Sequence, residues 1–350
     1  MNNFIGNRRN VNILKRAIEQ NRLPHALIFA GPAGVGKCTL ALFTAQALNC
    51  LAPQNGNACG FCTACRRIAA YVEIRRRECV KGAGAACGVC PACQERNRRH
   101  PDIRLIEPDE KTVISIDQIR NIIAETAFQP LEARYRVVIL DPADQMRAEA
   151  QNSLLKTLEE PPSRTIMILI AVNPYLLLDT IRSRARILPF GEIPSEQIAR
   201  HLMQKEGKSE QDSLLAAALS GGSLGAALEL NTTEYRVARE SALEFVTLLL
   251  NRGSFTRAGA IAADAAKDKD VFRTWIESAS ALLRDIYYSG AAPGRVGQRD
   301  LIEKLQALRQ NTRHPHLVFA IEAMRKLQAD LRYNVNRQIA LETLFIGLAR

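Results

Sequence analysis

The stretch from residue 26 to residue 48 constrains the fold more than any other part of the sequence. A short apolar run, 26–30 (ALIFA), leads into the loop 31–38 (GPAGVGKC), and 37–48 repeats its apolar residues at helical spacing. This strand–loop–helix order is typical of a Walker A phosphate-binding loop, whose glycines let backbone N–H groups converge on a phosphate. Lys37 would reach the terminal phosphates.

Two further apolar runs extend this pattern into a sheet. Segments 136–140 (RVVIL) and 165–172 (TIMILIAV) are predicted to be buried strands. Continuous apolar strands that alternate with helices predict a parallel sheet covered on both faces. After Pro189 the strand signal fades, and the remaining residues follow a mostly helical pattern. We therefore expect an α/β part followed by an all-α part.

The predicted nucleotide site departs from what hydrolysis needs. Position 38 normally supplies a hydroxyl to Mg²⁺, a hard cation that prefers oxygen to the sulfur of Cys38. Thr39 follows about 100° further around the helix. Asp141 ends a strand like a Walker B carboxylate, but Pro142 stands where ATPases usually carry a water-orienting Glu. The binding of ATP and Mg²⁺ therefore stays open, and Asp144 is expected to be structural.

Eight of the nine cysteines fall between residues 50 and 93 and form two similar modules. The spacing C-x2-C-x2-C occurs at 59–65 and again at 87–93, each time preceded by one more cysteine. Four thiolates close a tetrahedral site, which is typical of structural zinc, although iron–sulfur clusters and simple thiols are alternatives. We predict two structural zinc ions, bound by Cys50, Cys59, Cys62 and Cys65 and by Cys79, Cys87, Cys90 and Cys93.

The chain carries a net charge of +11, which favours anionic partners such as nucleic acid, nucleotide or an acidic protein face. An arginine-biased proteome with solvated surfaces would produce the same excess. No apolar run approaches the roughly 20 residues needed to cross a bilayer. The N-terminus lacks the charged region and apolar core of a signal peptide. We expect a cytoplasmic protein with no membrane partner.

Several motifs together resemble those of bacterial clamp-loader subunits, which are AAA+ proteins. They are 23–26 (LPHA), 100–102 (HPD), 152–162 (NSLLKTLEEPP), 180–184 (TIRSR) and, more weakly, 334–336 and 341–342. A four-cysteine module after the first helix belongs to the same pattern, whereas a second one does not. The resemblance implies three domains: an AAA+ P-loop core at 1–190 with zinc modules at 50–65 and 79–93, a small helical lid at 191–232, and a helical collar for oligomerisation at 233–350.

Within this family, the chain resembles the delta prime (stator) branch more than the ATP-hydrolysing gamma/tau branch. Cys38 and Pro142 replace residues that hydrolysis uses, and Gly225 stands where active subunits usually carry a sensor arginine. The HPD motif is also similar to that of delta prime. The resemblance implies a DNA polymerase III clamp-loader subunit with little or no ATPase, which would join gamma/tau and delta subunits to load a sliding clamp on primed DNA.

The resemblance also implies roles for single residues. Arg184 matches the arginine of the family's S-R-C motif, with Ala185 in place of the Cys. It would reach a neighbouring subunit's ATP site, where an arginine finger can contribute roughly 10³–10⁵ in rate. The alternative for Arg184 is a surface or interdomain salt bridge. The predicted nucleotide-site residues are Gly31, Gly34, Gly36, Lys37, Cys38, Thr39, Asp141 and Asn173, the last as a polar sensor.

Two other functions stay open at this point. The first is an active gamma/tau-type ATPase with an unusual Walker B segment. The second is a zinc-dependent nucleic-acid-binding module, in which phosphate contacts would make binding salt-dependent. It would use the arginines around the cysteines, which are Arg66, Arg67, Arg75, Arg76, Arg77, Arg96, Arg98 and Arg99. Only Phe61 and Tyr71 offer stacking surfaces there, which argues against base readout.

Overall fold

The computed structural model describes residues 4–76, 100–108, 113–331 and 336–349. The chain divides into two compact units. The first unit comprises Met1–Ile198 with Gly222–Ala226, and the second comprises Ala199–Gly221 with Ala227–Arg350. The division into core, lid and collar at residues 190 and 232 stays a prediction.

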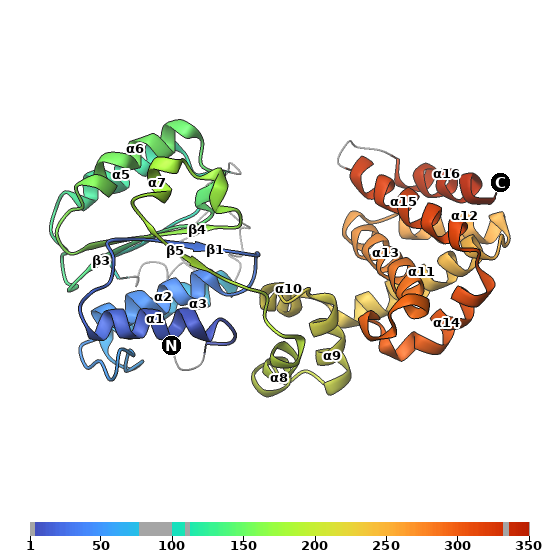
Figure 1. The fold of residues 1–350 in the computed structure, drawn as a ribbon, viewed down its shortest axis with the longest axis horizontal. Helices are drawn as coiled ribbons and strands as arrows, with labels where there is room; N and C mark the ends of the chain where they lie inside the picture. The colour runs from blue at the N-terminus through green and yellow to red at the C-terminus, as the bar shows by residue number, and fades with distance from the viewer. Residues whose placement is uncertain (1–3, 77–99, 109–112, 332–335, 350) are drawn as a thin grey trace. The chain divides into compact units, whose positions relative to one another are not determined.

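The first unit is built on a five-stranded, fully parallel sheet with the strand order β2–β3–β4–β1–β5 (Figure 1). The strands are β1 (Ala26–Ala30), β2 (Ile103–Ile106), β3 (Arg136–Leu140), β4 (Thr165–Ala171) and β5 (Arg186–Pro189). Every residue of β1, β3 and β4 is buried, as expected for central strands with both faces covered. Ala30 pairs with Ala171, so β1 and β4 end at the same edge.

Helices cover both faces of this sheet (Figure 1). One face carries α1 (Arg8–Glu19), α2 (Lys37–Asn49) and α3 (Thr63–Arg76), and the other carries α5 (Ile116–Thr126), α6 (Ala148–Glu159) and α7 (Asp179–Arg182). Alternate strand residues enter different apolar clusters. Leu27 and Phe29 pack into one cluster, whereas Ile28 packs into the other. Each cluster therefore fixes one helical layer on the sheet.

The second unit is helical throughout its described residues. Its core includes Trp275, Phe245 and Phe345, whose rings pack against one another. The helices from the end of the sheet onwards are α8 (Ser195–Lys205), α9 (Glu210–Leu219), α10 (Leu224–Glu229), α11 (Thr232–Leu250), α12 (Phe255–Ala265), α13 (Lys269–Ala291), α14 (Ile302–Asn311), α15 (His314–Asp330) and α16 (Arg337–Ala349).

The predicted fold class, an AAA+-type α/β core with a parallel sheet followed by helices, is confirmed. The three strands expected from apolar runs are present as β1, β3 and β4, with β4 one residue shorter than predicted. The sequences of β2 and β5 contain no continuous apolar run, so these two short strands were not predicted. Three of the four residues of β5 are exposed, which explains why its sequence does not look like a buried strand. No helix among the described residues is long and apolar enough to span a bilayer.

A buried ion pair holds the loop that leads into β3. Asp102, from the HPD motif, is fully buried and accepts hydrogen bonds from the backbone amides of residues 131, 132 and 133 at 2.7–2.9 Å. Arg136, also buried, lies 3.4 Å from the same carboxylate. Its guanidinium donates to the carbonyls of Phe128 at 2.7 Å and Gln129 at 3.2 Å. The motif thus has a structural explanation.

The held loop presents two large apolar side chains to solvent. Phe128 is 73% exposed and Leu131 is 77% exposed, although the backbone between them is tied to Asp102 and Arg136. A rigid loop loses little conformational entropy when a partner covers it. The loop therefore holds two exposed apolar side chains on a fixed backbone, which the apolar pattern of the sequence did not reveal.

Asp102→Asn is expected to lower the free energy of unfolding of the first unit by about 3 kcal/mol, because the buried Arg136 loses its counter-charge. Burial by itself would raise the pKa of Asp102, but the three amides and Arg136 outweigh it, and the pKa lies below its ordinary value of 3.8. The carboxylate therefore contributes stability above pH 3.8, and that contribution is lost as the pH falls through the folded-state pKa.

Urea unfolding followed by circular dichroism tests this, together with hydrogen exchange at amides 131–133. Trp275 lies in the second unit, so tryptophan fluorescence would not report the change. Asp117→Asn is the matched control, because the Asp117 side chain is 83% exposed. Equal stability of Asp102→Asn and wild type at pH 7 would contradict the argument.

Candidate functional site

The loop between β1 and α2 requires glycine for steric reasons. Gly34 and Gly36 have φ angles of 70° and 91°, which L side chains rarely adopt. A Cβ atom on Gly34 would lie 2.0 Å from the Ser223 Oγ, and one on Gly36 would lie 2.9 Å from the Phe4 ring. The loop follows the carboxyl end of β1 and opens α2, so the predicted phosphate-loop geometry is present in the chain.

Lys37, the first residue of α2, is buried and bonded within its own loop. Its Nζ donates to the carbonyls of Gly31 at 2.5 Å and Pro32 at 2.6 Å. Burial lowers the pKa of Lys37, and the nearby Asp141 and Asp144 carboxylates partly oppose this effect. The structure thus brings Lys37 together with Asp141, the predicted Walker B residue. To bind a phosphate, the Lys37 ammonium would have to break its hydrogen bonds to the Gly31 and Pro32 carbonyls.

The segment Gly222–Ala226 packs directly on the phosphate loop. The Gly225 amide donates to the Gly34 carbonyl at 2.9 Å. A Cβ atom on Gly225 would lie 3.1 Å from the Gly34 Cα, closer than most real contacts. A side chain at position 225 would therefore force the loop to shift. The glycine that stands in place of an arginine thus permits a close backbone contact between this segment and the loop.

The residues expected to bind Mg²⁺ offer a poor ligand set. Cys38 is buried and belongs to the apolar cluster beneath the sheet, and Thr39 is half-buried at the next position of α2. Mg²⁺ prefers hard oxygen ligands in octahedral geometry, which a thiol does not supply. Asp141 is half-buried and provides one carboxylate. The ATP and Mg²⁺ roles of these residues stay predictions.

Asp144 and Asn173 are occupied by local backbone contacts. The Asp144 Oδ2 accepts hydrogen bonds from the amides of Val172 and Asn173, each at 2.8 Å, and so ties the end of β4 to the segment after β3. The Asn173 Oδ1 accepts from the Tyr175 amide at 3.0 Å and caps a short 3-10 turn. These contacts support the structural interpretation of Asp144, and the sensor role of Asn173 stays a prediction.

Arg184 lies just after α7 on the surface of the first unit. Its Nη1 donates to the Thr180 carbonyl at 2.9 Å and to the Ser183 Oγ at 3.2 Å, and its Nη2 lies 2.7 Å from Glu159 Oε1. The Arg184 side chain is 35% exposed. A guanidinium held at the surface in this way is accessible to another molecule. It also makes the surface salt bridge that was the alternative interpretation.

The first cysteine module converges on one point. Cys50 ends α2, Cys59 and Cys62 lie in the following loop, and Cys65 lies in the first turn of α3. Their four Sγ atoms lie within 4.8 Å of one another, so the cluster could hold a metal ion. The Cys59 amide donates to the Cys50 sulfur at 3.1 Å, and the Cys62 amide donates to the Cys59 sulfur at 3.4 Å. The first four-cysteine group is thus confirmed as a cluster.

The four thiols differ in acidity. Burial raises the pKa of Cys50 and of Cys65. Burial would also raise the pKa of Cys59, but hydrogen bonds from the Cys62 and Phe61 amides outweigh it and lower the pKa to about 6. A thiolate is the form that binds metal. Cys59 is therefore ready to bind near neutral pH, whereas Cys50 and Cys65 must release a proton.

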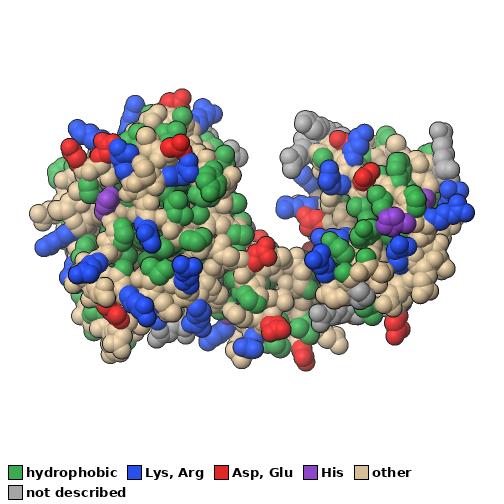
Figure 2. Space-filling view, in the orientation of Figure 1, with side chains coloured by type: hydrophobic (Ala, Val, Ile, Leu, Met, Phe, Trp, Pro, Cys, Tyr) green, Lys and Arg blue, Asp and Glu red, His purple; other side chains and the backbone are tan. Residues whose placement is uncertain are grey.

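The second predicted module, Cys79, Cys87, Cys90 and Cys93, lies outside the described residues. So do four of the eight arginines proposed to contact nucleic acid, which are Arg77, Arg96, Arg98 and Arg99. Among those described with side chains, Arg67 pairs with Glu132 at 2.5 Å and Arg66 is exposed. Figure 2 shows basic side chains spread over the visible face of each unit and interspersed with acidic ones. That face shows no continuous basic surface of the kind that a nucleic-acid module uses.

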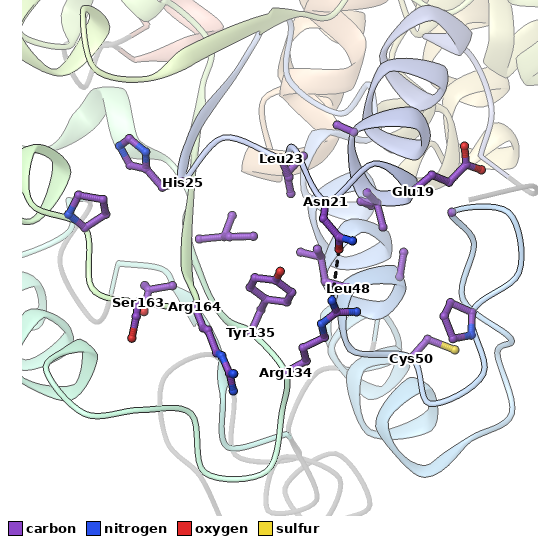
Figure 3. A pocket seen from close by; sticks show the side chains of 18 of the residues that line it. Glu19, Asn21, Leu23, His25, Leu48, Cys50, Arg134, Tyr135, Ser163 and Arg164 are labelled. Carbon is purple, nitrogen blue, oxygen red and sulfur yellow. Dashed lines mark hydrogen bonds between the residues drawn. The ribbon is translucent and has the colours of Figure 1, made fainter.

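A cavity of about 690 Å³ lies at the other edge of the sheet, where the strands begin (Figure 3). Leu23, His25 and Tyr135 line it, and Cys50 stands at its rim. The Arg134 guanidinium lies over the Tyr135 ring at 5.6 Å and bonds Asn21 Oδ1 at 3.3 Å. The sequence gave no signal for this cavity, and it is distinct from the phosphate loop at the opposite edge.

A family model and curated relatives each match part of the chain. A family model described as "DNA polymerase III, delta subunit" matches residues 6–73 and 74–194, more than half of the chain. The chain is similar to DNA polymerase III subunit delta' of Pseudomonas aeruginosa, 34% identical over 65% of this chain and 62% of the relative. It is also similar to subunit delta' of Bacillus subtilis, 33% identical over 58% of this chain and 53% of the relative.

The chain thus matches less than two thirds of the length of these curated relatives. Among solved structures, a gamma subunit-related protein of DNA polymerase III from Thermotoga maritima is 15% identical and aligns over 97% of this chain and 98% of that chain, with a TM-score of 0.39.

Metal binding by the first cysteine module is expected to weaken as the pH falls. Zn²⁺ affinity should drop by at least about tenfold per pH unit between pH 8 and pH 6, because protons compete for thiolate ligands. Competition with a chromophoric chelator measures this. Cys38→Ser is the control, since Cys38 lies outside the cluster and should leave the affinity unchanged. If the Zn²⁺ affinity changed neither with pH nor in the Cys62→Ser variant, binding at this site would be contradicted.

Proposed function

Because the chain belongs to the DNA polymerase III delta subunit family, we propose that it is a delta prime-type subunit of a bacterial clamp loader. In the bacterial cytoplasm it would join gamma/tau and delta subunits and help place a sliding clamp on primed DNA. The observation that carries the proposal is the family match over residues 6–194, which spans the sheet, the first cysteine module and Arg184. The polymerase-associated complex, not this chain, would hydrolyse ATP.

The nucleotide site supports a subunit without turnover of its own. Hydrolysis needs a metal ligand at position 38, a water-orienting carboxylate after Asp141 and a cation near Gly225, and the chain carries Cys38, Pro142 and glycine there. The close packing of Gly225 on Gly34 leaves little room to restore an arginine. These three replacements together disfavour the gamma/tau-type motor.

Arg184 supplies the part that this subunit would contribute to catalysis. A guanidinium at the surface can enter the ATP site of a neighbouring subunit and stabilise the charge that develops on the transferred phosphoryl group. Arg184 is held just after α7 with about a third of its side chain accessible. The stator would thus lack hydrolysis in its own site and assist hydrolysis in the next one.

Zinc fits the first cysteine module better than an iron–sulfur cluster does. A tetrahedral ion with bonds of about 2.3 Å separates its sulfur ligands by about 3.8 Å. The Cys59 and Cys65 sulfurs are 4.0 Å apart, and all four lie within 4.8 Å. A cluster of several iron atoms would need its ligands further apart. The filled ligand set and the lack of an open position support a structural ion that joins α2 to α3.

The isolated chain is expected to show no ATP turnover above background, even with Mg²⁺ and primed DNA. In a reconstituted complex, Arg184→Ala is expected to lower DNA-stimulated ATPase by at least about tenfold, since an arginine finger is worth more than that. Assembly should be unchanged. Steady-state phosphate release and gel filtration measure the two effects.

Arg182→Ala is the matched control, since Arg182 lies in the same segment and is paired with Asp179. Robust turnover by the isolated chain, abolished by Lys37→Ala, would identify a motor subunit instead. Unchanged turnover of the Arg184→Ala complex would remove the finger role.

The purified chain is expected to carry two zinc ions, one in each cysteine module. Elemental analysis by mass spectrometry counts them. Cys62→Ser should remove the first ion and Cys90→Ser the second, and each variant should keep the other ion. One zinc per wild-type chain would limit the site to the first module, and visible iron–sulfur absorbance would replace zinc with a cluster.

A further inference from the structure

The ion pair between Glu159 and Arg184 joins two motifs that the sequence separates. Glu159 is the last residue of α6, in the stretch 152–162, and Arg184 follows α7. The Glu159 Oε1 lies 2.7 Å from the Arg184 Nη2, and the two side chains are 49% and 35% exposed. The conspicuous NSLLKTLEEPP motif therefore has a carboxylate in direct contact with the arginine to which the finger role is assigned.

The contacts divide the guanidinium into a held part and an available part. A guanidinium has five N–H groups in a fixed plane. In the structure Nη1 donates to the Thr180 carbonyl and to the Ser183 Oγ, and Nη2 lies 2.7 Å from Glu159 Oε1 in an ion pair. Nε makes no hydrogen bond to the described residues, so the guanidinium keeps a donor with which to contact a phosphate oxygen. Glu159 thus fixes the plane of the group without using all its donors.

The position of Glu159 runs against local helix preference. A negative side chain at a helix C-terminus faces the partial negative charge of the last carbonyls, which is unfavourable. Here Glu159 and Glu160 both stand at the end of α6, just before two prolines stop the helix. A half-exposed ion pair adds little folding stability in return. A residue placed against local preference, with so small a gain in stability, is typical of a functional position.

We propose that Glu159 is a positioning residue for Arg184. It holds the long, flexible arginine side chain in one orientation, so that the open donors of the guanidinium are in place before a neighbouring subunit's nucleotide arrives. An arginine otherwise populates many rotamers, and fixing one in advance spares that entropy when the complex forms. This inference rests on the proposed function, because it assigns Glu159 a part in the trans-acting role of Arg184.

Reconstituted clamp-loader complex tests the proposal, with ATP and primed DNA as the probes. Glu159→Ala is expected to lower kcat about two- to fivefold, the factor that corresponds to the coupling of a half-exposed ion pair. KM for ATP and assembly should stay unchanged. Glu159→Gln keeps a hydrogen-bond acceptor and should recover part of the loss. Glu160→Ala is the matched control, because it removes the adjacent charge and should behave as wild type.

The double variant Glu159→Ala/Arg184→Ala separates positioning from a general effect. If Glu159 acts through Arg184, the double variant should turn over at the rate of Arg184→Ala alone. A further loss in that background, or a faster rate for Glu159→Ala, would overturn the proposal. Thermal melting of each variant checks that the fold is intact, and Glu159→Gln serves if the alanine variant melts early.

The failure of this inference can be told from the failure of the proposed function. If Arg184→Ala lowers turnover and Glu159→Ala does not, only the positioning role is wrong. If Arg184→Ala itself behaves as wild type, the finger role and the positioning role are both wrong. If the chain does not assemble with gamma/tau and delta subunits, the proposed function is wrong as a whole.

Discussion

The in-register pairing of β1 with β4 and β5 determines where the chemical groups of the first unit lie. Because all five strands run parallel, their carboxyl ends meet at one edge. Gly31 follows β1 there and donates its amide to Ala171 at the end of β4. Asp141 follows β3 at the same edge. The apolar strands that make this sheet stable therefore also bring the phosphate loop and the carboxylates together, as in other open α/β sheets.

The groups at this edge are bonded mainly to the protein itself. Lys37 donates to loop carbonyls, Asp144 accepts from β4 amides, and Gly225 lies against Gly34. A hydrolytic site instead needs donors and carboxylates aimed at the reacting phosphate and its metal ion. The loop is thus bonded to its own surroundings, since Lys37 donates to the carbonyls of Gly31 and Pro32 and Gly34 accepts from the Gly225 amide.

The sequence predicted correctly those features that depend on residues close together in the chain. Continuous apolar runs identified β1, β3 and β4, and cysteine spacing identified the first metal-type cluster, because both depend on residues close together in the chain. The edge strand β5 was missed, since three of its four residues are exposed. Asp102 and Arg136 are separated by 34 positions in the sequence, and Gly34 and Gly225 are separated by 191 positions. Such contacts follow from tertiary packing, which no local pattern records.

The phosphate loop and the surface arginine Arg184 lie apart because different elements of the first unit carry them. The phosphate loop joins β1 to α2, whereas Glu159 ends α6 and Arg184 follows α7, and these two helices lie on the opposite face of the sheet from α2. A defect in one need not weaken the other, because they lie on different elements that cover opposite faces of the sheet. A chain of this family can therefore lose hydrolysis at its own loop and still keep an aligned arginine for a neighbour.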